Sequence, residues 1–318
     1  MGNACECCAY LGELCAERHQ DCAAMGRGKG RRNRLATMIG KVETIMRFPI
    51  KSLLGETLDE CAISSSGLDG DRALALVDTA TGKIASAKQP NLWRDLLKLS
   101  AKTDPSKLYP RITVTNAAGT QLDHLDEKFD LWLSELLGRS VKLIETRPDG
   151  VALNRARPDE VLERGIDQAV TQDLLAIAAA APDGGFFDFA PIHLMTATSL
   201  DAISSFAPEA SISAERYRPN LVIETTSSPA FAENQWVGRR VQLGQSVRLE
   251  IIAPTPRCAV PLLSHGALPA SPAAVGAVNK LNRVEFPLLG PGKFPCLGAY
   301  ATVLSSGSIH RGDPVSIE

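Results

Sequence analysis

The chain has 318 residues, of which 44% are hydrophobic and 22% are charged, and its formal net charge at pH 7 is −2. These values are typical of a globular protein with one large domain or two medium ones. The small net charge and an aromatic content of 5% argue against a general nucleic-acid binder, and no apolar run reaches the roughly 18–20 residues of a membrane-spanning helix.

Residues 1–37 differ in composition from the rest of the chain. Five of the eight cysteines fall within the first 22 residues, and a run rich in glycine, lysine and arginine follows them. We predict a disordered extension, because neither strand alternation nor an amphipathic face is visible. Alternatives are a start of the natural chain at Met38 and a zinc site, although the candidate ligands do not repeat a paired Cys-x-x-Cys spacing. Those ligands are Cys5, Cys8, His19 and Cys22.

The other three cysteines predict a reducing compartment. Cys61, Cys258 and Cys296 are scattered along the sequence, which is not the pattern of a disulfide framework. The N-terminal residues also do not form the apolar segment of a secretory signal. We therefore expect a cytoplasmic protein.

From Ile39 onward the sequence predicts a mostly β unit that extends to about residue 147. A short helix is expected at 127–137, ended by Gly138, because its apolar residues recur at helical spacing. Turn residues at 78–82 and 116–119 predict hairpin connections. The expected strands are 42–48, 57–65, 73–77, 83–87, 111–115 and 141–145.

The second half of the chain predicts another β-rich unit. A polar stretch at 147–165 is expected to be a linker, and helices are expected at 173–180 and, capped by Ser199, at 200–206. Short strands at this spacing are typical of a barrel, whose closure removes exposed edges. The predicted fold class is therefore β-rich α+β, with one β-barrel domain over 38–147 and a linker and second barrel over 148–318. The strands expected in the second barrel are one leading into His193, then 221–224, 239–243, 248–252 and 299–304.

One segment places a cysteine between prolines directly after a predicted strand, as Pro254-Thr-Pro-Arg257-Cys258-Ala-Val-Pro261. The neighbouring Arg257 would favour the thiolate form of Cys258, which ligates metals and attacks electrophiles. The alternative is a buried cysteine that packs as a small apolar side chain.

Two further strand ends carry cations. Phe48-Pro-Ile-Lys51-Ser52 ends the first predicted strand, and a glycine-rich turn leads into Asp71-Arg72. Lysine, serine and arginine at loop ends are suited to holding a phosphate through charge-assisted hydrogen bonds. Each motif alone is also typical of surface residues, and Asp71 beside Arg72 is consistent with a local ion pair.

Five blocks, in this order along the chain, resemble a known family. The first two are similar to the N-terminal β-barrel domain that precedes MOSC domains, and the last three are similar to the MOSC domain itself. The resemblance runs from about Ile39 to Ile317 and is greatest to the amidoxime-reducing branch, whose members reduce N-hydroxylated compounds. The blocks are Phe48-Pro-Ile-Lys-Ser52, Gly-Asp-Arg72, Ala-Glu-Arg-Tyr-Arg218-Pro-Asn220-Leu-Val-Ile, Pro-Arg-Cys258, and Leu-Gly-Ala-Tyr300 with Gly-Asp-Pro314-Val.

The resemblance implies a Mo-molybdopterin cofactor bound between the two domains. Cys258 would ligate molybdenum and act as the catalytic residue. Two groups of residues would hold the terminal phosphate and the pterin, one from each domain. They are Lys51, Ser52 and Arg72 on the N-terminal side, and Thr198, Ser199 and Arg218 on the MOSC side.

The same resemblance implies three more cofactor-binding residues, namely Asn220, Arg257 and Tyr300. For Tyr300 a core position in a strand is the alternative, and for Asn220 a cap of the Arg-Pro turn. His193 is expected to be a structural histidine. After Cys258 the residues through His265 depart from the pattern of better-known members, and this departure concerns the substrate side of the site.

The implied activity is a molybdenum-dependent oxidoreductase that reduces small N-hydroxylated substrates. Its electrons would come from a separate flavin, haem or iron–sulfur protein, because the chain has neither an iron–sulfur nor a haem-attachment cysteine spacing. The first alternative is a carrier that binds or delivers the molybdenum cofactor or its sulfur without turning over small molecules. The second is a pyridoxal-phosphate-dependent sulfur transferase, although no Schiff-base lysine within a large α/β fold is visible.

Overall fold

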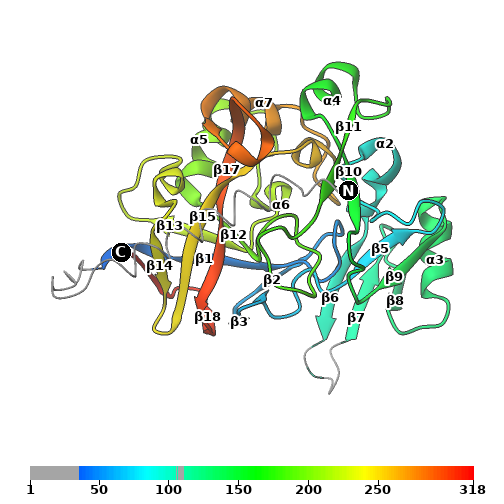
Figure 1. The fold of residues 1–318 in the computed structure, drawn as a ribbon, viewed down its shortest axis with the longest axis horizontal. Helices are drawn as coiled ribbons and strands as arrows, with labels where there is room; N and C mark the ends of the chain where they lie inside the picture. The colour runs from blue at the N-terminus through cyan, green and yellow to red at the C-terminus, as the bar shows by residue number, and fades with distance from the viewer. Residues whose placement is uncertain (1–35, 105, 107–110) are drawn as a thin grey trace, which may run out of the picture.

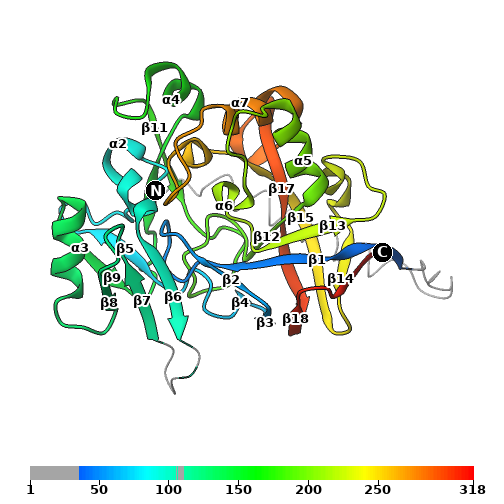
Figure 2. The same ribbon diagram turned by 180° about the vertical axis from the view of Figure 1, so that it is seen from behind.

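The computed structural model describes residues 36–104, 106 and 111–318. The predictions for the N-terminal extension, including the zinc ligands Cys5, Cys8, His19 and Cys22, lie outside the described residues. Figures 1 and 2 show a β-rich molecule in which a barrel occupies one side and a smaller β unit with α3 (Phe129–Leu137) the other. The prediction of a β-rich α+β fold is confirmed.

Seven strands within the described residues form a closed barrel. Their order is β12-β13-β1-β19-β14-β15-β17, and β17 also pairs with β12, which closes the ring. Neighbours are antiparallel except β12 and β13, which are parallel and are joined through helices. Two short strands extend the sheet, because β2 pairs with β1 and β16 pairs with β17. The strands are β1 (Thr37–Arg47), β2 (Glu56–Leu58), β12 (Ile192–Thr196), β13 (Leu221–Thr225), β14 (Arg240–Leu243), β15 (Val247–Pro256), β16 (Arg283–Glu285), β17 (Lys293–Ser305) and β19 (Pro314–Ile317).

The barrel core follows from strand periodicity. In β15, Val247, Leu249 and Ile251 alternate with less buried residues, because successive side chains of a strand point to opposite faces. They pack with buried residues of other barrel strands, such as Leu194 and Val241. Each buried side chain of this kind stabilises the fold by roughly 1.5–3 kcal/mol.

The smaller β unit has its own core. The antiparallel strands β6, β7 and β8 form one sheet, and β5 pairs with β9 in another. Trp93, Leu96, Val114 and Leu133 are among the residues buried between these strands and the helices. The elements are β5 (Ala75–Asp78), α2 (Pro90–Trp93), η1 (Arg94–Lys98), β6 (Ser100–Asp104), β7 (Arg111–Thr115), β8 (Gln121–Asp123) and β9 (Val141–Ile144).

Strands from the beginning and the end of the described chain pair within and beside the barrel. The first strand, β1, lies in the barrel between β13 and β19. Near the C-terminus, β18 (Gly307–His310) pairs with β3 (Glu60–Ser64), which in turn pairs with β4 (Gly67–Leu68). The loops that follow β1 and β4 are thereby fixed against the barrel.

Three local expectations differ from the structure. The expected helix at 173–180 is instead the strand β11 (Gln172–Ala176), and the stretch 147–165 contains β10 (Ala152–Ala156) and α4 (Pro158–Arg164). The hydrogen-bonded partner β10 outweighs the high helix propensity of leucine and alanine, because intrinsic propensity is readily overridden by tertiary pairing. A hairpin between strands 73–77 and 83–87 was also expected. In the structure β5 pairs along its length with β9, and it meets the 83–87 segment at an isolated bridge between Val77 and Ile84.

Helices cover one end of the barrel, as Figure 1 shows for α5 and α7. The predicted helix at 200–206 is confirmed as α5, but its N-cap is Thr196, whose side chain accepts a hydrogen bond from the Ser199 backbone N–H. No helix within the described residues has the length and apolar character needed to cross a membrane. The helices of this region are α5 (Ala197–Phe206), α6 (Ala214–Tyr217), η2 (Ala232–Trp236), η3 (Val260–Leu262), α7 (Ala273–Leu281) and η4 (Pro287–Leu289).

Candidate functional site

A cavity of about 540 Å³ is lined by residues of both units, which is within the size range of small-molecule and cofactor sites. Eight of the ten predicted site residues line it, although their roles toward a ligand stay predictions. These eight are Lys51, Ser52, Arg72, Arg218, Asn220, Arg257, Cys258 and Tyr300.

The other two predicted residues, Thr198 and Ser199, are not among the residues that line the cavity. Ser199 is fully buried and its hydroxyl lies 2.9 Å from Glu233 Oε2 and 2.7 Å from Thr196 Oγ1. Thr198 donates to Thr196 Oγ1 over 3.2 Å. In this structure both residues belong to a hydroxyl–carboxyl network at the start of α5.

Three loop residues of the cavity have left-handed backbone conformations. The φ angles of Ser52, Arg72 and Arg218 are 68°, 50° and 57°, a region that residues with a Cβ rarely adopt. The Arg72 conformation is held by a hydrogen bond from its N–H to the Phe48 carbonyl, 2.7 Å long. Such strain concentrates at binding sites, where neighbouring structure keeps it in place.

Arg72 and Arg218 come from different units but share one aromatic ring. Their guanidinium carbons lie 4.9 Å and 4.2 Å from the centre of the Phe48 ring, which is cation–π geometry. Arg72 also forms an ion pair with Asp71 and donates to the Arg218 carbonyl over 3.1 Å. Arg218 donates to the Leu53 carbonyl over 2.7 Å. Burial, reinforced by Arg72, lowers the pKa of Arg218 to about 9, so its charge is retained at neutral pH.

Asn220 connects the same two units. Its side-chain N–H₂ donates to Asp71 Oδ2 over 2.9 Å, and its Oδ1 accepts from the His193 backbone N–H over 3.1 Å. Asp71 in turn accepts from the Phe48 N–H over 2.7 Å. Asn220 therefore fixes the loop that carries Arg72 against β12, a role beyond the predicted alternative of capping its own turn.

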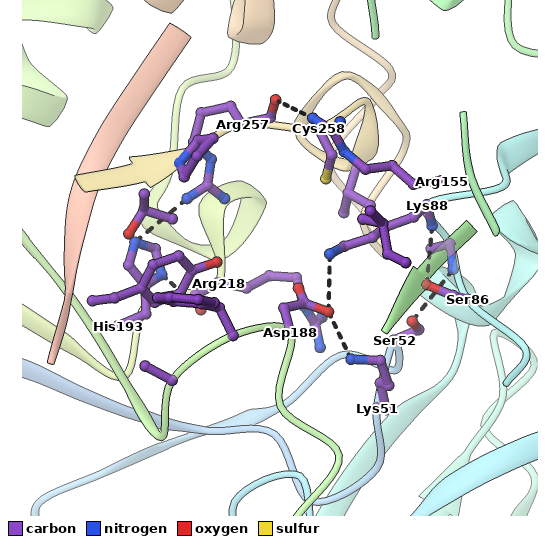
Figure 3. Close-up of a pocket in the computed structure, with 18 of the residues that line it drawn as sticks. Lys51, Ser52, Ser86, Lys88, Arg155, Asp188, His193, Arg218, Arg257 and Cys258 are labelled. Atoms are coloured by element: carbon purple, nitrogen blue, oxygen red, sulfur yellow. Dashed lines mark hydrogen bonds and ion pairs between the residues drawn. The ribbon is translucent and has the colours of Figure 1, made fainter. Parts of the chain in front are cut away.

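Lys51 and Lys88 converge on one carboxylate, Asp188 (Figure 3). The distances from their Nζ atoms to Asp188 Oδ1 are 2.6 Å and 3.0 Å. Burial lowers the pKa of Lys51 to about 8, although Asp188 opposes that shift. Burial alone would raise the pKa of Asp188, but the two lysines hold it well below its ordinary value. Sequence reasoning missed Lys88 and Asp188, which lie in no motif and approach Lys51 only in the fold.

His193 also lines the cavity, beside Arg257. Burial, together with the charge of Arg257, lowers the pKa of His193 to about 3, so the ring is neutral at physiological pH. Its Nδ1 lies 3.4 Å from the Arg218 carbonyl and its Nε2 3.4 Å from Arg257 Nη1. Its Nε2 also lies 3.4 Å from the Leu297 carbonyl, so a proton on either ring nitrogen can be donated to a backbone carbonyl.

Arg257 is held by backbone carbonyls. It donates to Tyr217 and Leu297 over 2.8 Å and 3.3 Å, and its buried Nε has no hydrogen-bond partner among the described residues. These bonds fix the guanidinium of Arg257 in the lining of the cavity.

The three cysteines of the described chain differ in burial and in their position relative to the cavity. Cys258 lines the cavity and is partly exposed, and Figure 3 shows its sulfur directed toward the cavity interior. Cys296 is fully buried, does not line the cavity, and has a pKa raised to about 12 by burial. Cys61 lies in the barrel core, and burial likewise raises its pKa. Cys258 is the cysteine placed to meet a ligand.

The charge balance of the cavity favours an anionic ligand. Six basic side chains line it, against the single carboxylate of Asp188 within the described lining, and such an excess attracts phosphate-like groups. Across the described residues, no three His, Cys, Asp or Glu side chains form a metal-binding group. The basic residues are Lys51, Arg72, Lys88, Arg155, Arg218 and Arg257.

Comparison with known proteins matches two family models to the chain. The MOSC N-terminal beta barrel domain matches residues 39–140 and the MOSC domain matches residues 182–316. Mitochondrial amidoxime-reducing component 1 from Mus musculus is 24% identical over 324 residues, which cover 92% of this chain and 86% of that protein. The Homo sapiens protein of the same name is 24% identical over 316 residues, covering 90% and 85%. Among solved structures, the YUAD protein from Bacillus subtilis aligns with a TM-score of 0.40 at 11% identity, covering 88% of this chain and 96% of that one.

Proposed function

The chain belongs to the family in which a MOSC N-terminal beta barrel domain precedes a MOSC domain, and on that premise we propose that it is a molybdenum-dependent oxidoreductase that reduces N-hydroxylated compounds. The observation that carries the proposal is one cavity in which the Cys258 sulfur lies among six basic side chains. The similarity to amidoxime-reducing components supports the choice of reaction.

The residues of the cavity fit a phosphorylated pterin cofactor. Lys51, Ser52, Arg72 and Arg218 would hold its phosphate, because they offer charged and neutral donors at loop ends. Cys258 would supply the soft thiolate that molybdenum favours. When bound, the cofactor supplies two-electron exchange coupled to oxygen transfer.

Other residues would line the wall around the cofactor. Arg257 and Asn220 are held by backbone groups and by Asp71, so they would form a fixed polar part of that wall. Burial raises the pKa of Tyr300, so its hydroxyl keeps its proton and can donate a hydrogen bond.

The proposed reaction breaks the N–O bond of the substrate. Two electrons and two protons convert R–NH–OH into R–NH₂ and water. The electrons come from a separate flavin, haem or iron–sulfur protein, and an artificial donor such as reduced methyl viologen replaces it in an assay.

Cys258→Ser is the test of this proposal, with Cys296→Ser as the matched control. Purified wild-type protein should contain molybdenum and pterin, and it should reduce benzamidoxime with reduced methyl viologen. In the Cys258 variant turnover should fall by orders of magnitude, because a serine hydroxyl is a harder and far less acidic donor. X-ray absorption at the molybdenum edge should count one sulfur neighbour fewer in that variant alone.

Three outcomes would contradict the proposal. Protein without molybdenum would remove its basis, and bound molybdenum without turnover would favour a cofactor carrier. Loss of the extra sulfur neighbour in the Cys296 variant, with retention in the Cys258 variant, would show that the wrong ligand had been chosen.

A further inference from the structure

Arg155 brings a cation into the cavity from a segment that lies between the two matched domains. It belongs to β10, within residues 141–181, which follow the matched N-terminal region and precede the matched MOSC region. The strand is held on both flanks of Arg155, because Leu153 and Ala156 are 0% and 1% exposed and the Ala156 N–H donates to the Lys88 carbonyl over 2.9 Å. The backbone of Arg155 is therefore fixed, and its side chain lines the cavity.

The Arg155 guanidinium lies beside Cys258. Its Nη2 is 3.5 Å from the Arg257 carbonyl oxygen, and this carbonyl belongs to the peptide bond that directly precedes Cys258. Figure 3 shows Arg155 next to Cys258, whose sulfur is directed into the cavity. A ligand group bound by Arg155 would therefore lie close to the Cys258 sulfur.

Arg155 has no anionic partner within the described part of the chain. Asp188 is the single carboxylate of the described lining, and Lys51 and Lys88 bind it over 2.6 Å and 3.0 Å. Among the described residues, the guanidinium makes one hydrogen bond, to the Arg257 carbonyl, at the long limit for such a bond. A guanidinium carries five N–H donors in a planar fork that matches a carboxylate, so most donors of Arg155 are left for a ligand.

The position of Arg155 favours the substrate as the source of that ligand group. In the proposed function, the cofactor phosphate is held by Lys51, Ser52, Arg72 and Arg218, which lie on loops of the two matched domains. The N–O bond of the substrate must instead approach the metal at Cys258. An anionic group that reaches Arg155 at the same time would lie only a few atoms from that N–O bond.

We infer that Arg155 is a specificity-determining residue that binds a carboxylate of the substrate, and that the protein prefers N-hydroxylated compounds with a carboxylate one or two carbons from the N–OH group. The inference rests on the proposed function and goes beyond it by naming the charge and the position of the recognised group. The carboxylate would accept two charge-assisted hydrogen bonds from the guanidinium. Two electrons from the external donor and two protons then convert HO–NH–CH₂–COO⁻ into H₂N–CH₂–COO⁻ and water, and the carboxylate is unchanged.

The test compares N-hydroxyglycine with its methyl ester, which has the same N–OH group without the negative charge. With reduced methyl viologen as donor, the wild-type holoprotein should show a KM for the acid at least tenfold lower than for the ester, which corresponds to about 1.4 kcal/mol. Arg155→Gln should raise the KM for the acid at least tenfold and leave that for the ester nearly unchanged. Arg155→Lys should be intermediate, because it keeps the charge and loses the planar fork.

Arg157→Gln is the matched control on the same segment. Arg157 forms an ion pair with Asp173 over 3.2 Å and is not among the described residues that line the cavity. Its replacement should leave both KM values unchanged. Molybdenum and pterin per polypeptide and the urea midpoint should be the same in both glutamine variants, since neither side chain is part of a buried core.

Binding of glycolate, which has a carboxylate and a hydroxyl but no N–O bond, separates this inference from the proposed function. Calorimetry on the purified protein should show weaker glycolate binding by Arg155→Gln than by Arg157→Gln. That difference in binding, without turnover of either substrate by the wild-type protein, would overturn the proposed function but not the carboxylate site. Equal KM values for acid and ester, or equal glycolate binding by the two variants, would overturn the carboxylate site. Loss of molybdenum and pterin from Arg155→Gln would also overturn it and would assign Arg155 to the cofactor.

Discussion

Arg216 holds the segment that follows Cys258, so its replacement tests how this part of the site is stabilised. The side chain is fully buried and its guanidinium donates hydrogen bonds to four backbone carbonyls. Three of the acceptors lie within twelve residues after Cys258. The acceptors are Ser211 at 2.5 Å, Pro261 at 3.3 Å, Leu263 at 3.0 Å and Pro269 at 2.6 Å.

The expected cost of Arg216→Met follows from these contacts. Hydrogen bonds to a charged group contribute about 1.5–3 kcal/mol each, so four give a gross contribution of roughly 6–12 kcal/mol. Desolvation of the buried cation offsets a large part of that sum. The variant, however, leaves several buried carbonyls unpaired, and we expect the free energy of unfolding to fall by about 3–5 kcal/mol.

Urea unfolding measures this loss, with Arg240→Met as the control. Arg240 is exposed on β14, and its replacement should change stability by less than about 0.5 kcal/mol. Arg216→Lys should be intermediate, because one ammonium group cannot reach four carbonyls in a planar arrangement. Amide hydrogen exchange in residues 259–269 should accelerate first. A loss below about 1 kcal/mol in Arg216→Met would refute the reasoning.

Three further outcomes are expected. Lys51→Ala combined with Arg72→Ala should nearly abolish pterin retention, measured as molybdenum and pterin per polypeptide, because a phosphate dianion loses two of its cations; full occupancy would contradict this. Pure protein should not oxidise NADH steadily in the presence of benzamidoxime, since no Gly-x-Gly-x-x-Gly follows a strand. Burial lowers the pKa values of His193 and His265 to about 3 and about 4, below the unfolded value of about 6.5. As pH falls, the unfolded state therefore binds these protons before the folded state does, which favours unfolding. The urea midpoint should fall as pH drops from about 6.5 toward 4. In His193→Gln this fall should be less steep, because one of the two groups is removed.

The barrel could be predicted because its signals are local. Alternation of apolar residues in β15, with turn residues between strands, is visible in short windows of sequence. The helix expected at 173–180 failed for the opposite reason. Leu174 and Leu175 suit a helix or a strand equally, and the choice was made by β10, a partner some twenty residues earlier in the chain.

The candidate site was predictable where a motif carried it and not elsewhere. Lys51, Arg72 and Cys258, each of which follows a predicted strand in a recognisable block, line one cavity, and their roles toward a ligand stay predictions. Asp188 was missed because its role depends on Lys51, 137 residues away. Ser199 was expected near the cofactor, but its hydroxyl donates to the buried carboxyl of Glu233. Because Glu233 is 34 residues away in the sequence, this contact could not be predicted from the residues around Ser199.

The arrangement of the cations explains why neither matched domain contains the site by itself. Arg72, from the N-terminal unit, donates to the Arg218 carbonyl, and Arg218 donates back to the Leu53 carbonyl. Both guanidiniums rest on Phe48, which directly follows the barrel strand β1. Their left-handed backbone conformations are costly in isolation and are kept by these reciprocal contacts. Closure of the barrel around β1 therefore brings the two like charges together, and an anionic ligand would relieve their repulsion.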